Sequence, residues 1–248
     1  VDEICREIKA AEQFEAQHAP GAKPLRPHQS NALHNWERQD RRGILEHATG
    51  SGKTFKAICA MRNALGRHEV PLILVPSELL LNQWHREVME NLPDLNPQIL
   101  RCGVGHTKWR DEGLIGPWTR AGSETPRIVL STMQTAAMAE FRTAIKQGSH
   151  LFLVADEVHR VGSPKHLHLL SLDTGPRLGL SATPRRAGDP EGTARILEYF
   201  NGIVPPPFTL QDAIKSGALT PYFYHVHTVQ LTSTEQEQWD EITKRIRR

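Results

Sequence analysis

Short apolar runs alternate with longer stretches of helical periodicity along most of the chain. The apolar runs occupy residues 43–47, 71–75, 98–102, 127–131, 151–155 and 177–181. The helix-compatible stretches occupy residues 53–65, 78–91, 133–147 and 192–200. Continuously apolar strands that alternate with helices are typical of a parallel sheet that is buried on both faces. We therefore predict an α/β fold with a mostly parallel sheet and helices on both faces.

The two ends of the chain follow a different pattern from the middle. Residues 1–20 contain a segment of helical spacing that ends where Pro and Gly become frequent. The proline-rich sequence at 203–208 indicates a boundary. Beyond it, residues 221–231 read as a strand. The sequence after that strand reads as a helix, which begins with a possible capping box between Thr232 and Glu235.

The composition fits a globular protein and excludes several other classes. Of the 248 residues, 38% are hydrophobic and 23% are charged. No apolar run approaches the ~20 residues that a membrane span needs. The three cysteines are scattered, which argues against a disulfide scaffold or a zinc site and favours a reducing compartment. The net charge of +2 is too mild to indicate a nucleic-acid partner. Because the chain begins with Val1 and stops in a basic helical stretch, we expect a fragment of a longer protein.

The sequence ATGSGKT lies between the first predicted strand and the first long predicted helix, the context that a phosphate-binding loop requires. Gly50 and Gly52 allow backbone N–H groups to turn toward phosphates, and the helix that starts near Lys53 adds its positive N-terminus. Lys53 can reach the β- and γ-phosphates, and Thr54 can bind Mg²⁺. The general pattern has glycine where this chain has His47. The alternative interpretation is a glycine turn that caps a helix.

A phosphate-binding loop predicts an acidic residue at the end of another buried strand, and LFLVADEVH supplies two. Asp156 is placed to hold Mg²⁺, directly or through water. Glu157 is placed to orient and deprotonate the attacking water. The alternative, a solvated pair of carboxylates at the end of a strand, becomes weak when the loop upstream is considered.

Three short sequences occur in an informative order, because ATGSGKT and DEVH are followed by SAT at residues 181–183. Together they resemble motifs I, II and III of superfamily 2 helicases and translocases. The sequence LRPHQ at residues 25–29 resembles the adenine-recognising segment of the XPB-like and restriction-enzyme-motor branch. LVPSELLLNQW and VLSTMQTA resemble motifs Ia and Ib, which line the nucleic-acid backbone in that family. The resemblance covers residues 25–231 and implies a RecA-like P-loop NTPase fold.

The resemblance implies a role for each matching residue. The nucleotide contacts would be Arg26, Gln29, Thr49, Gly50, Ser51, Gly52, Lys53 and Thr54. The catalytic residues would be Lys53, Asp156 and Glu157, with Mg²⁺ held by Thr54 and Asp156. Residues His159, Ser181 and Thr183 would couple the nucleotide to movement. The nucleic-acid track would consist of Pro76, Ser77, Ser131, Thr132 and Gln134. For Ser77 and Thr132, a helix N-cap is an equally good interpretation, and both roles can hold at once.

The resemblance also implies cofactors, partners and a place in a larger protein. The cofactors are ATP and Mg²⁺, and the partner is DNA, with the duplex favoured and a single strand possible. Motors of this family have two RecA-like lobes, and no Q-x-x-G-R-x-x-R segment of a second lobe is found here. We therefore expect the second lobe elsewhere in the parent chain, and nuclease or defence-complex subunits as further partners. We expect a location in the prokaryotic cytoplasm and no membrane association.

The expected organisation has three parts, because the 43 residues after position 205 are too few for a second lobe. Residues 1–20 form a helical segment, residues 21–205 form the ATP-binding lobe, and residues 206–248 begin the connection to the second lobe. The favoured function is the ATP-binding lobe of a DNA helicase or translocase, in restriction or phage defence.

Several alternatives stay open at this stage. The protein could be a nucleic-acid-gated switch that does not translocate, or an RNA helicase. A non-catalytic module is disfavoured because the residues for catalysis are intact. The loop at 101–110 could approach DNA or could be a flexible loop with a packed Trp109. For Arg185 and Arg186 a solvated surface is the default interpretation. The HLHLL stretch at 166–170 reads as a packed helix rather than a metal site.

Overall fold

The structure is a computed structural model that describes residues 24–221 and 223–246. The predicted helical segment at 1–20 lies outside the described residues. Six strands form one sheet, and every neighbouring pair is parallel. The strands are β1 (Arg42–Glu46), β2 (Val70–Val75), β3 (Gln98–Cys102), β4 (Arg127–Thr132), β5 (Leu151–Asp156) and β6 (Arg177–Ser181). Their order across the sheet is β1-β6-β5-β2-β4-β3, so the predicted parallel α/β fold is confirmed.

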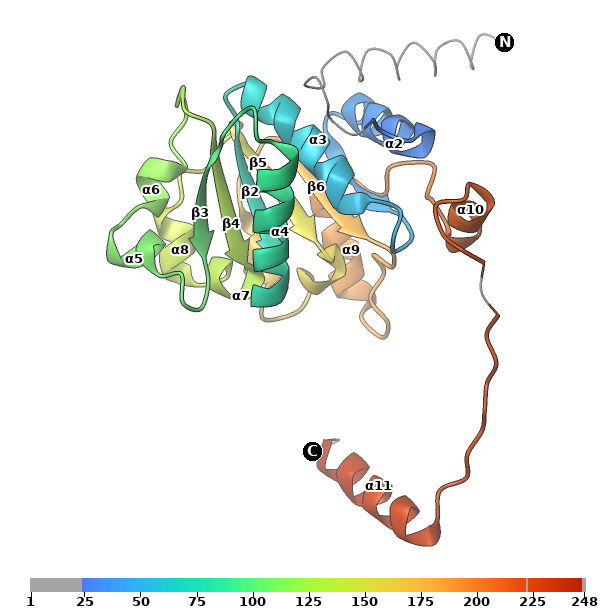
Figure 1. Ribbon diagram of the computed structural model, residues 1–248. Coiled ribbons are helices and arrows are strands. Elements are labelled where there is room, and N and C mark those ends of the chain that lie inside the picture. Colours follow the sequence, from blue (N-terminus) through green and yellow to red (C-terminus); the bar gives the residue numbers. More distant parts are fainter. Residues whose placement is uncertain (1–23, 222, 247–248) are drawn as a thin grey trace.

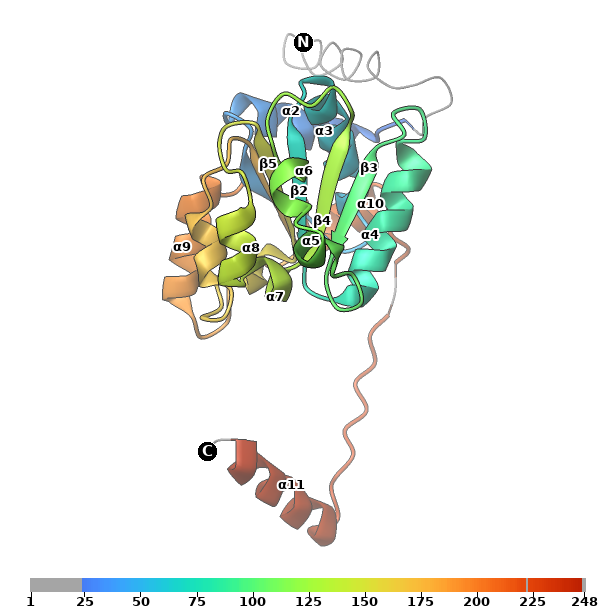
Figure 2. The same cartoon turned by 90° about the vertical axis from the view of Figure 1, so that its left-hand side faces the viewer.

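Helices cover both faces of this sheet, as Figures 1 and 2 show. One face carries α2 (Pro27–Arg38), α3 (Lys53–Gly66) and α4 (Glu78–Asn91). The other face carries α5 (Lys108–Asp111), α6 (Ile115–Trp118), α7 (Met133–Ala136), α8 (Ala139–Ala144) and α9 (Pro190–Phe200), with the 3-10 turns η1 (Val158–Arg160) and η2 (Leu167–Ser171). Successive side chains of a strand point to opposite faces, so each strand contributes to both cores.

The central strands are almost continuously apolar because neither of their faces is solvated. All six residues of β2 and of β5 are buried, and the two strands lie side by side in the middle of the sheet. Phe152 of β5 projects into the core on the α2–α4 face, where its ring lies 5.4 Å from the ring of Trp36 of α2. The six strands predicted between residues 43 and 181 and the long helices at 53–65 and 78–91 agree with the structure to within one residue at each end.

Two predicted elements differ from the structure. The expected helix at 133–147 is divided into α7 and α8, because Met138 adopts an extended backbone conformation between them. The predicted strand at 221–231 is wrong for every residue there that the structure describes. The side chains described within this segment are exposed, including Phe223 at 91% exposure. A strand needs a partner for its backbone groups, and no other strand of the described chain lies beside this segment.

The chain after α9 closes the free edge of β1. Ile44 donates its N–H to Gly202 and accepts from Val204, and Phe208 donates to Glu46. This pairing satisfies edge groups that would otherwise face solvent. Two further helices follow, α10 (Leu210–Lys215) and α11 (Ser233–Ile246). The predicted capping box at the start of α11 is present, with Thr232 and Glu235 bonded to each other.

Figure 1 shows α11 apart from the sheet, at the end of an extended segment. Its apolar residues Trp239 and Ile242 are exposed. No helix in the described part of the chain is both long and apolar enough to cross a membrane.

The central position of Phe152 yields a test of the core. We expect Phe152→Ala to lower the free energy of unfolding by about 3–5 kcal/mol, because it leaves a cavity between β5 and α2. Urea denaturation of the chain measures this change. Leu79→Ala is the control: Leu79 is 77% exposed on α4, and its truncation should change stability by less than about 0.5 kcal/mol. Equal effects of the two substitutions would contradict this packing.

Candidate nucleotide-binding site

The ATGSGKT loop connects the carboxyl end of β1 to the first turn of α3. Gly50 and Gly52 have φ values of 79° and 77°, which glycine adopts at low cost. The Nζ atom of Lys53 donates to the carbonyl oxygens of His47 at 3.0 Å and Ala48 at 3.3 Å, so the loop wraps around this side chain. Burial lowers the pKa of Lys53, and the charges of Glu157 and Asp156 oppose that shift. The amino group therefore lies in the field of both carboxylates.

The start of α2 contacts the same loop. The Nε2 atom of Gln29 donates to the Ser51 carbonyl oxygen at 3.1 Å, and Oε1 accepts from the Arg26 N–H at 2.9 Å. A Cβ at position 52 would lie 2.3 Å from Gln29 Nε2, so any other residue there would displace the Gln29 amide and would be strained at a φ of 77°. The structure thus brings Gln29 against the loop and attaches it to the backbone of Arg26. The predicted adenine segment and phosphate loop are neighbours.

The DEVH box follows β5, two strands away from β1. Asp156 ends the strand and is buried, while Glu157 adopts a left-handed conformation with φ of 49°. The Glu157 N–H donates to Asp156 Oδ1 at 3.0 Å. The turn therefore separates the two side chains, which leaves Glu157 at the half-exposed rim and Asp156 in the interior.

The DEVH box is joined directly to the SAT segment. His159 Nδ1 lies 3.1 Å from Ser181 Oγ, which also accepts from the Thr183 N–H at 3.1 Å. Burial lowers the pKa of His159, although Glu157, whose carboxylate is 3.5 Å away, raises it. Gly179 of β6 leaves room for this turn, since a Cβ there would lie 2.9 Å from Ile44 Cγ1 and 3.1 Å from Val158 Cγ2. The three predicted coupling residues therefore form one hydrogen-bonded group.

Two observations indicate that the residues of this loop suit the binding of a phosphate chain with Mg²⁺. The hydroxyl of Ser51 is buried and has no hydrogen-bond partner within the described chain, although the loop around it is polar. Lys53 provides a positive charge among glycines at positive φ. The hydroxyl of Thr54 and the carboxylate of Asp156 are hard oxygen ligands of the kind that Mg²⁺ prefers. Thr49 and Gly50 are exposed at the mouth of the loop.

The predicted nucleic-acid residues lie at the carboxyl ends of β2 and β4, at the same edge of the sheet. Ser77 caps α4 by accepting from the Leu80 N–H, and Thr132 caps α7 by accepting from the Thr135 N–H. The N-cap interpretation is therefore confirmed for both. Ser131 is fully buried and donates its hydroxyl to the Thr132 carbonyl, so its side chain does not reach the surface. Pro76, Ser77 and Gln134 are at least partly exposed.

The structure favours packing roles for the remaining polar stretches. Trp109 is buried against Phe141, with ring centroids 5.4 Å apart, which favours the packed-loop interpretation of 101–110. Arg186 donates to the His159 carbonyl at 2.6 Å and pairs with Asp189, so the surface interpretation is wrong for it. The HLHLL stretch forms η2, and no group of three potential metal ligands occurs among the described residues.

Sequence analysis missed a buried cluster beneath the loop. Lys56, on α3, is fully buried and donates from Nζ to His47 Nδ1 at 2.7 Å. His47 and His28 both stack on Phe208, with centroid distances of 5.6 Å and 4.1 Å. Leu219 also covers the loop, since a Cβ on Gly50 would lie 2.7 Å from its Cδ2 atom. A lysine on an amphipathic helix reads as exposed, so no sequence signal indicated this cluster.

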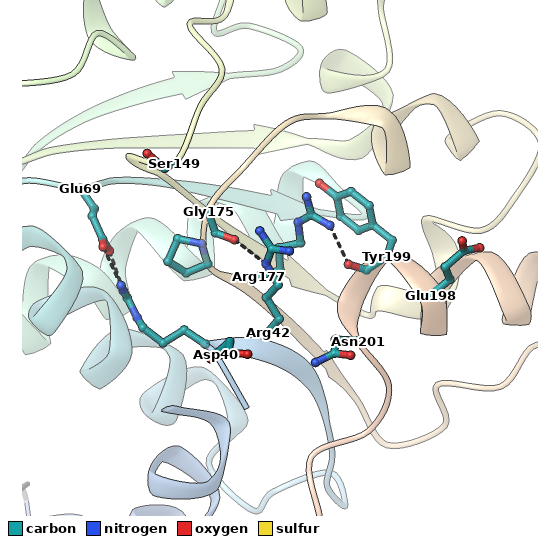
Figure 3. A pocket seen from close by; sticks show the side chains of 11 residues that line it. Asp40, Arg42, Glu69, Ser149, Gly175, Arg177, Glu198, Tyr199 and Asn201 are labelled. Carbon is teal, nitrogen blue, oxygen red and sulfur yellow. Dashed lines mark hydrogen bonds and ion pairs between the residues drawn. The ribbon is translucent and has the colours of Figure 1, made fainter. Parts of the chain in front are cut away.

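A separate hollow of about 510 Å³ lies at the amino ends of β1 and β6, opposite the phosphate loop (Figure 3). Its arginines bond to the protein itself. Arg41 donates to the Glu69 carboxylate at 2.6 Å, Arg42 donates to the Gly175 carbonyl at 3.1 Å, and Arg177 donates to the Tyr199 carbonyl at 2.8 Å. These bonds fasten the sheet to α9 and to the start of β2, which gives the hollow a structural role.

A single parallel sheet with a phosphate loop after β1 and an acidic box after β5 defines a P-loop NTPase of the RecA-like class. Residues 22–186 match the family described as "Type III restriction enzyme, res subunit". The chain belongs to this family, which is the first lobe of superfamily 2 helicases.

Relatives named as a DNA helicase and a DNA translocase support the same assignment. The chain is 35% identical over 182 residues to a candidate Rad25 DNA 3′-5′ helicase of Haloarcula marismortui, covering 73% of this chain and 25% of the relative. It is 27% identical over 231 residues to the DNA 3′-5′ translocase XPB2 of Sulfurisphaera tokodaii, covering 90% of this chain and 44% of the relative. The chain thus spans less than half the length of these curated relatives.

A solved structure has the same fold. The Type ISP restriction-modification enzyme LlaGI, in complex with a DNA substrate mimic, aligns with a TM-score of 0.60 at 19% identity. The alignment covers 79% of this chain and 21% of LlaGI.

The buried His47 predicts a specific pH dependence of stability. Burial and the nearby Lys56 lower the pKa of His47 from 6.5 to about 2. Below pH 6.5 the unfolded chain therefore binds a proton that the folded chain does not, so stability falls as the pH falls. We expect protonation of His47 in the unfolded chain to lower the free energy of unfolding by about 1 kcal/mol when the pH is lowered from 6 to 5.

Urea denaturation of wild type and His47→Gln at these two pH values measures this contribution. Lys56, whose pKa is lowered to about 7, is protonated in both states at these pH values. The pH dependence should be weaker in His47→Gln by that amount and unchanged in His34→Gln, which alters a partly exposed histidine of α2. If the stability of His47→Gln depended on pH as strongly as that of the wild type, His47 would be protonated to the same extent in the folded and unfolded states, which would contradict the lowered pKa.

Proposed function

We propose that this chain is the ATP-binding lobe of an ATP-dependent DNA helicase or translocase that acts on duplex DNA. The observation that carries the proposal is the convergence of the phosphate loop, the DEVH box and the SAT segment at one edge of the sheet. The hydrogen bond between His159 and Ser181 joins the last two of them. The family supports the class of activity, and the names of the relatives support DNA as the partner.

Each residue of the site has a chemical role in this proposal. Gln29 and Arg26 bind the adenine end of the nucleotide, and the loop from Thr49 to Thr54 binds its phosphates. Lys53 neutralises charge on the β- and γ-phosphates, and bound Mg²⁺ would further neutralise the transferring group. Thr54 and Asp156 hold that ion. Glu157, at the half-exposed rim, orients the attacking water and accepts its proton.

The remaining residues connect hydrolysis to movement. His159, Ser181 and Thr183 form a hydrogen-bonded group between the DEVH box and the chain that leads toward α9. A change in the position of Glu157 on hydrolysis would reach Ser181 through His159. Pro76, Ser77 and Gln134 at the same edge contact the DNA backbone without reading its sequence. The description of the matching family supports restriction or phage defence as the setting, and we expect a cytoplasmic location and a nuclease as partner.

The proposal predicts nucleic-acid-stimulated ATP hydrolysis by the full-length parent protein. We expect duplex DNA to stimulate steady-state ATPase activity more than single-stranded DNA or RNA. Glu157→Gln should lower the stimulated rate by at least about 10²-fold while nucleotide binding persists, because only the base is lost. Stimulation of the ATPase rate by RNA alone would identify the protein as an RNA-remodelling enzyme instead. ATP hydrolysis at a rate that no nucleic acid changes would contradict the proposed motor function.

Stimulation by duplex DNA without movement would identify a DNA-gated switch. A triplex-displacement assay on the same preparation separates the two, since only a translocating motor removes a third strand from duplex DNA.

A second prediction concerns this chain by itself. In the proposed motor, an arginine from the second lobe stabilises charge on the transferring phosphoryl group, an effect worth about 10³–10⁵ in rate. We expect the 248-residue chain to bind a fluorescent ATP analogue but to hydrolyse ATP at least 10³-fold more slowly than the stimulated parent. Rapid turnover that Glu157→Gln abolishes would show that this lobe completes the site without the second one.

A further inference from the structure

A tryptophan on α4 holds the buried carboxylate of the DEVH box. The Nε1 atom of Trp84 donates to Asp156 Oδ2 at 2.8 Å. Trp84 is 1% exposed, and Asp156 is 9% exposed. The other carboxylate oxygen, Oδ1, accepts from the Glu157 N–H at 3.0 Å. Each oxygen of Asp156 therefore has one donor, and the two donors fix the plane of the carboxylate.

The fold explains why a residue of α4 reaches the carboxyl edge of β5. Helix α4 begins directly after β2, which is the neighbour of β5 in the sheet. It then runs back across the sheet, with Leu81, Trp84 and Val88 buried against it. Side chains of a helix tilt toward its N-terminus, so the indole of Trp84 returns toward the edge that carries Asp156. The contact joins residues 72 positions apart in the sequence.

The chemistry of the indole suits this position. An indole N–H only donates, so it stabilises the anionic carboxylate and cannot bond to the proton of a neutral acid. It uses one lone pair of Oδ2 and leaves the second lone pair of that oxygen for a metal ion or its water. A hydrogen bond to a charged group contributes more than one between neutral groups. Trp84 thereby fixes the orientation of a buried carboxylate.

We propose that Trp84 is the positioning residue for the metal-holding carboxylate of Asp156, and that it sets the affinity of the site for Mg²⁺. This inference rests on the proposed function, because Asp156 has an ion to hold only where the loop binds a nucleotide with Mg²⁺. It assigns to Trp84 a role beyond packing. A packing role predicts lost stability, whereas a positioning role predicts a changed requirement for the metal.

The chain offers a matched control for this role. Trp36 is equally buried, and its Nε1 donates to the Arg177 carbonyl at 3.0 Å, at the opposite edge of the sheet. Trp84→Phe and Trp36→Phe each keep a buried aromatic ring and remove one indole hydrogen bond. Lost packing should therefore be similar in the two variants. Only Trp84→Phe removes a donor from the carboxylate that the proposal assigns to the metal.

The test measures binding of fluorescently labelled ADP to the full-length protein, with and without Mg²⁺. The ratio of the two dissociation constants gives the contribution of the metal. We expect Trp84→Phe to raise the Mg²⁺ concentration for half-maximal binding about 10-fold or more, as loss of a residue that supports a metal ligand commonly does. ADP binding without Mg²⁺ should stay unchanged, and Trp36→Phe should match wild type. An unchanged Mg²⁺ requirement in Trp84→Phe, or equal shifts in both variants, would overturn the inference.

A mutant cycle identifies the group through which Trp84 acts. In an Asp156→Asn background, the further change Trp84→Phe should leave the Mg²⁺ requirement unaltered, because the carboxylate is already gone. Additive effects would overturn the inference. Failure of the proposed function gives a different result: wild type itself would then show no gain in ADP affinity from Mg²⁺. A gain in wild type that Trp84→Phe retains would contradict only the role of Trp84.

A measurement on unmutated Trp84 covers the case in which Trp84→Phe does not fold. Protein labelled with 5-fluorotryptophan contains five labelled positions. The ¹⁹F resonance that Asp156→Asn moves identifies Trp84. We expect this resonance to shift when Mg²⁺ is added to the ADP complex of the otherwise unmutated protein. A resonance that Asp156→Asn moves but Mg²⁺ does not would overturn the inference.

Discussion

The site depends on the parallel arrangement of the six strands. Because every strand ends at the same edge of the sheet, every segment that follows a strand emerges on one side of the molecule. The strand order then selects which of these segments become neighbours. Strand β6 lies between β1 and β5, so the SAT segment lies between the phosphate loop and the DEVH box, although it comes last in the sequence.

Burial of charge is the main electrostatic cost of this arrangement. The site has two lysines on one helical turn, Lys53 and Lys56, and burial lowers the pKa of both. Each has a different partner. Lys53 bonds to loop carbonyls and lies in the field of two carboxylates, whereas Lys56 bonds to the neutral ring of His47. The histidine that replaces glycine at the first position of the loop thus gives the second lysine an acceptor.

The segment that follows α9 belongs physically to the site. It pairs with the edge of β1, inserts Phe208 between two histidines and covers the loop with Leu219. A connection toward another lobe would therefore begin on top of the phosphate loop. Helix α4 provides a second link, since it begins at Ser77, on the predicted nucleic-acid track, and carries the indole that holds Asp156. Both links join the nucleotide site to regions where, in the proposed motor, the second lobe and DNA would bind.

Local patterns determined the elements and the motifs of this protein. Apolar runs fixed the six strands, because a strand buried on both faces has no polar positions, and glycine spacing with Lys53 and Thr54 fixed the loop. The strand predicted at 221–231 was wrong, because a strand-like pattern of side chains carries no information about whether a partner strand lies beside it. Tertiary structure alone decided that Trp84 meets Asp156, that Lys56 is buried beneath His47, and that Phe208 returns to the loop. The contact between Trp84 and Asp156 depends on the order of strands in the sheet, which joins residues 72 positions apart and leaves no local signal. Lys56 and His47 are nine positions apart, and their contact depends on the path of the loop between them.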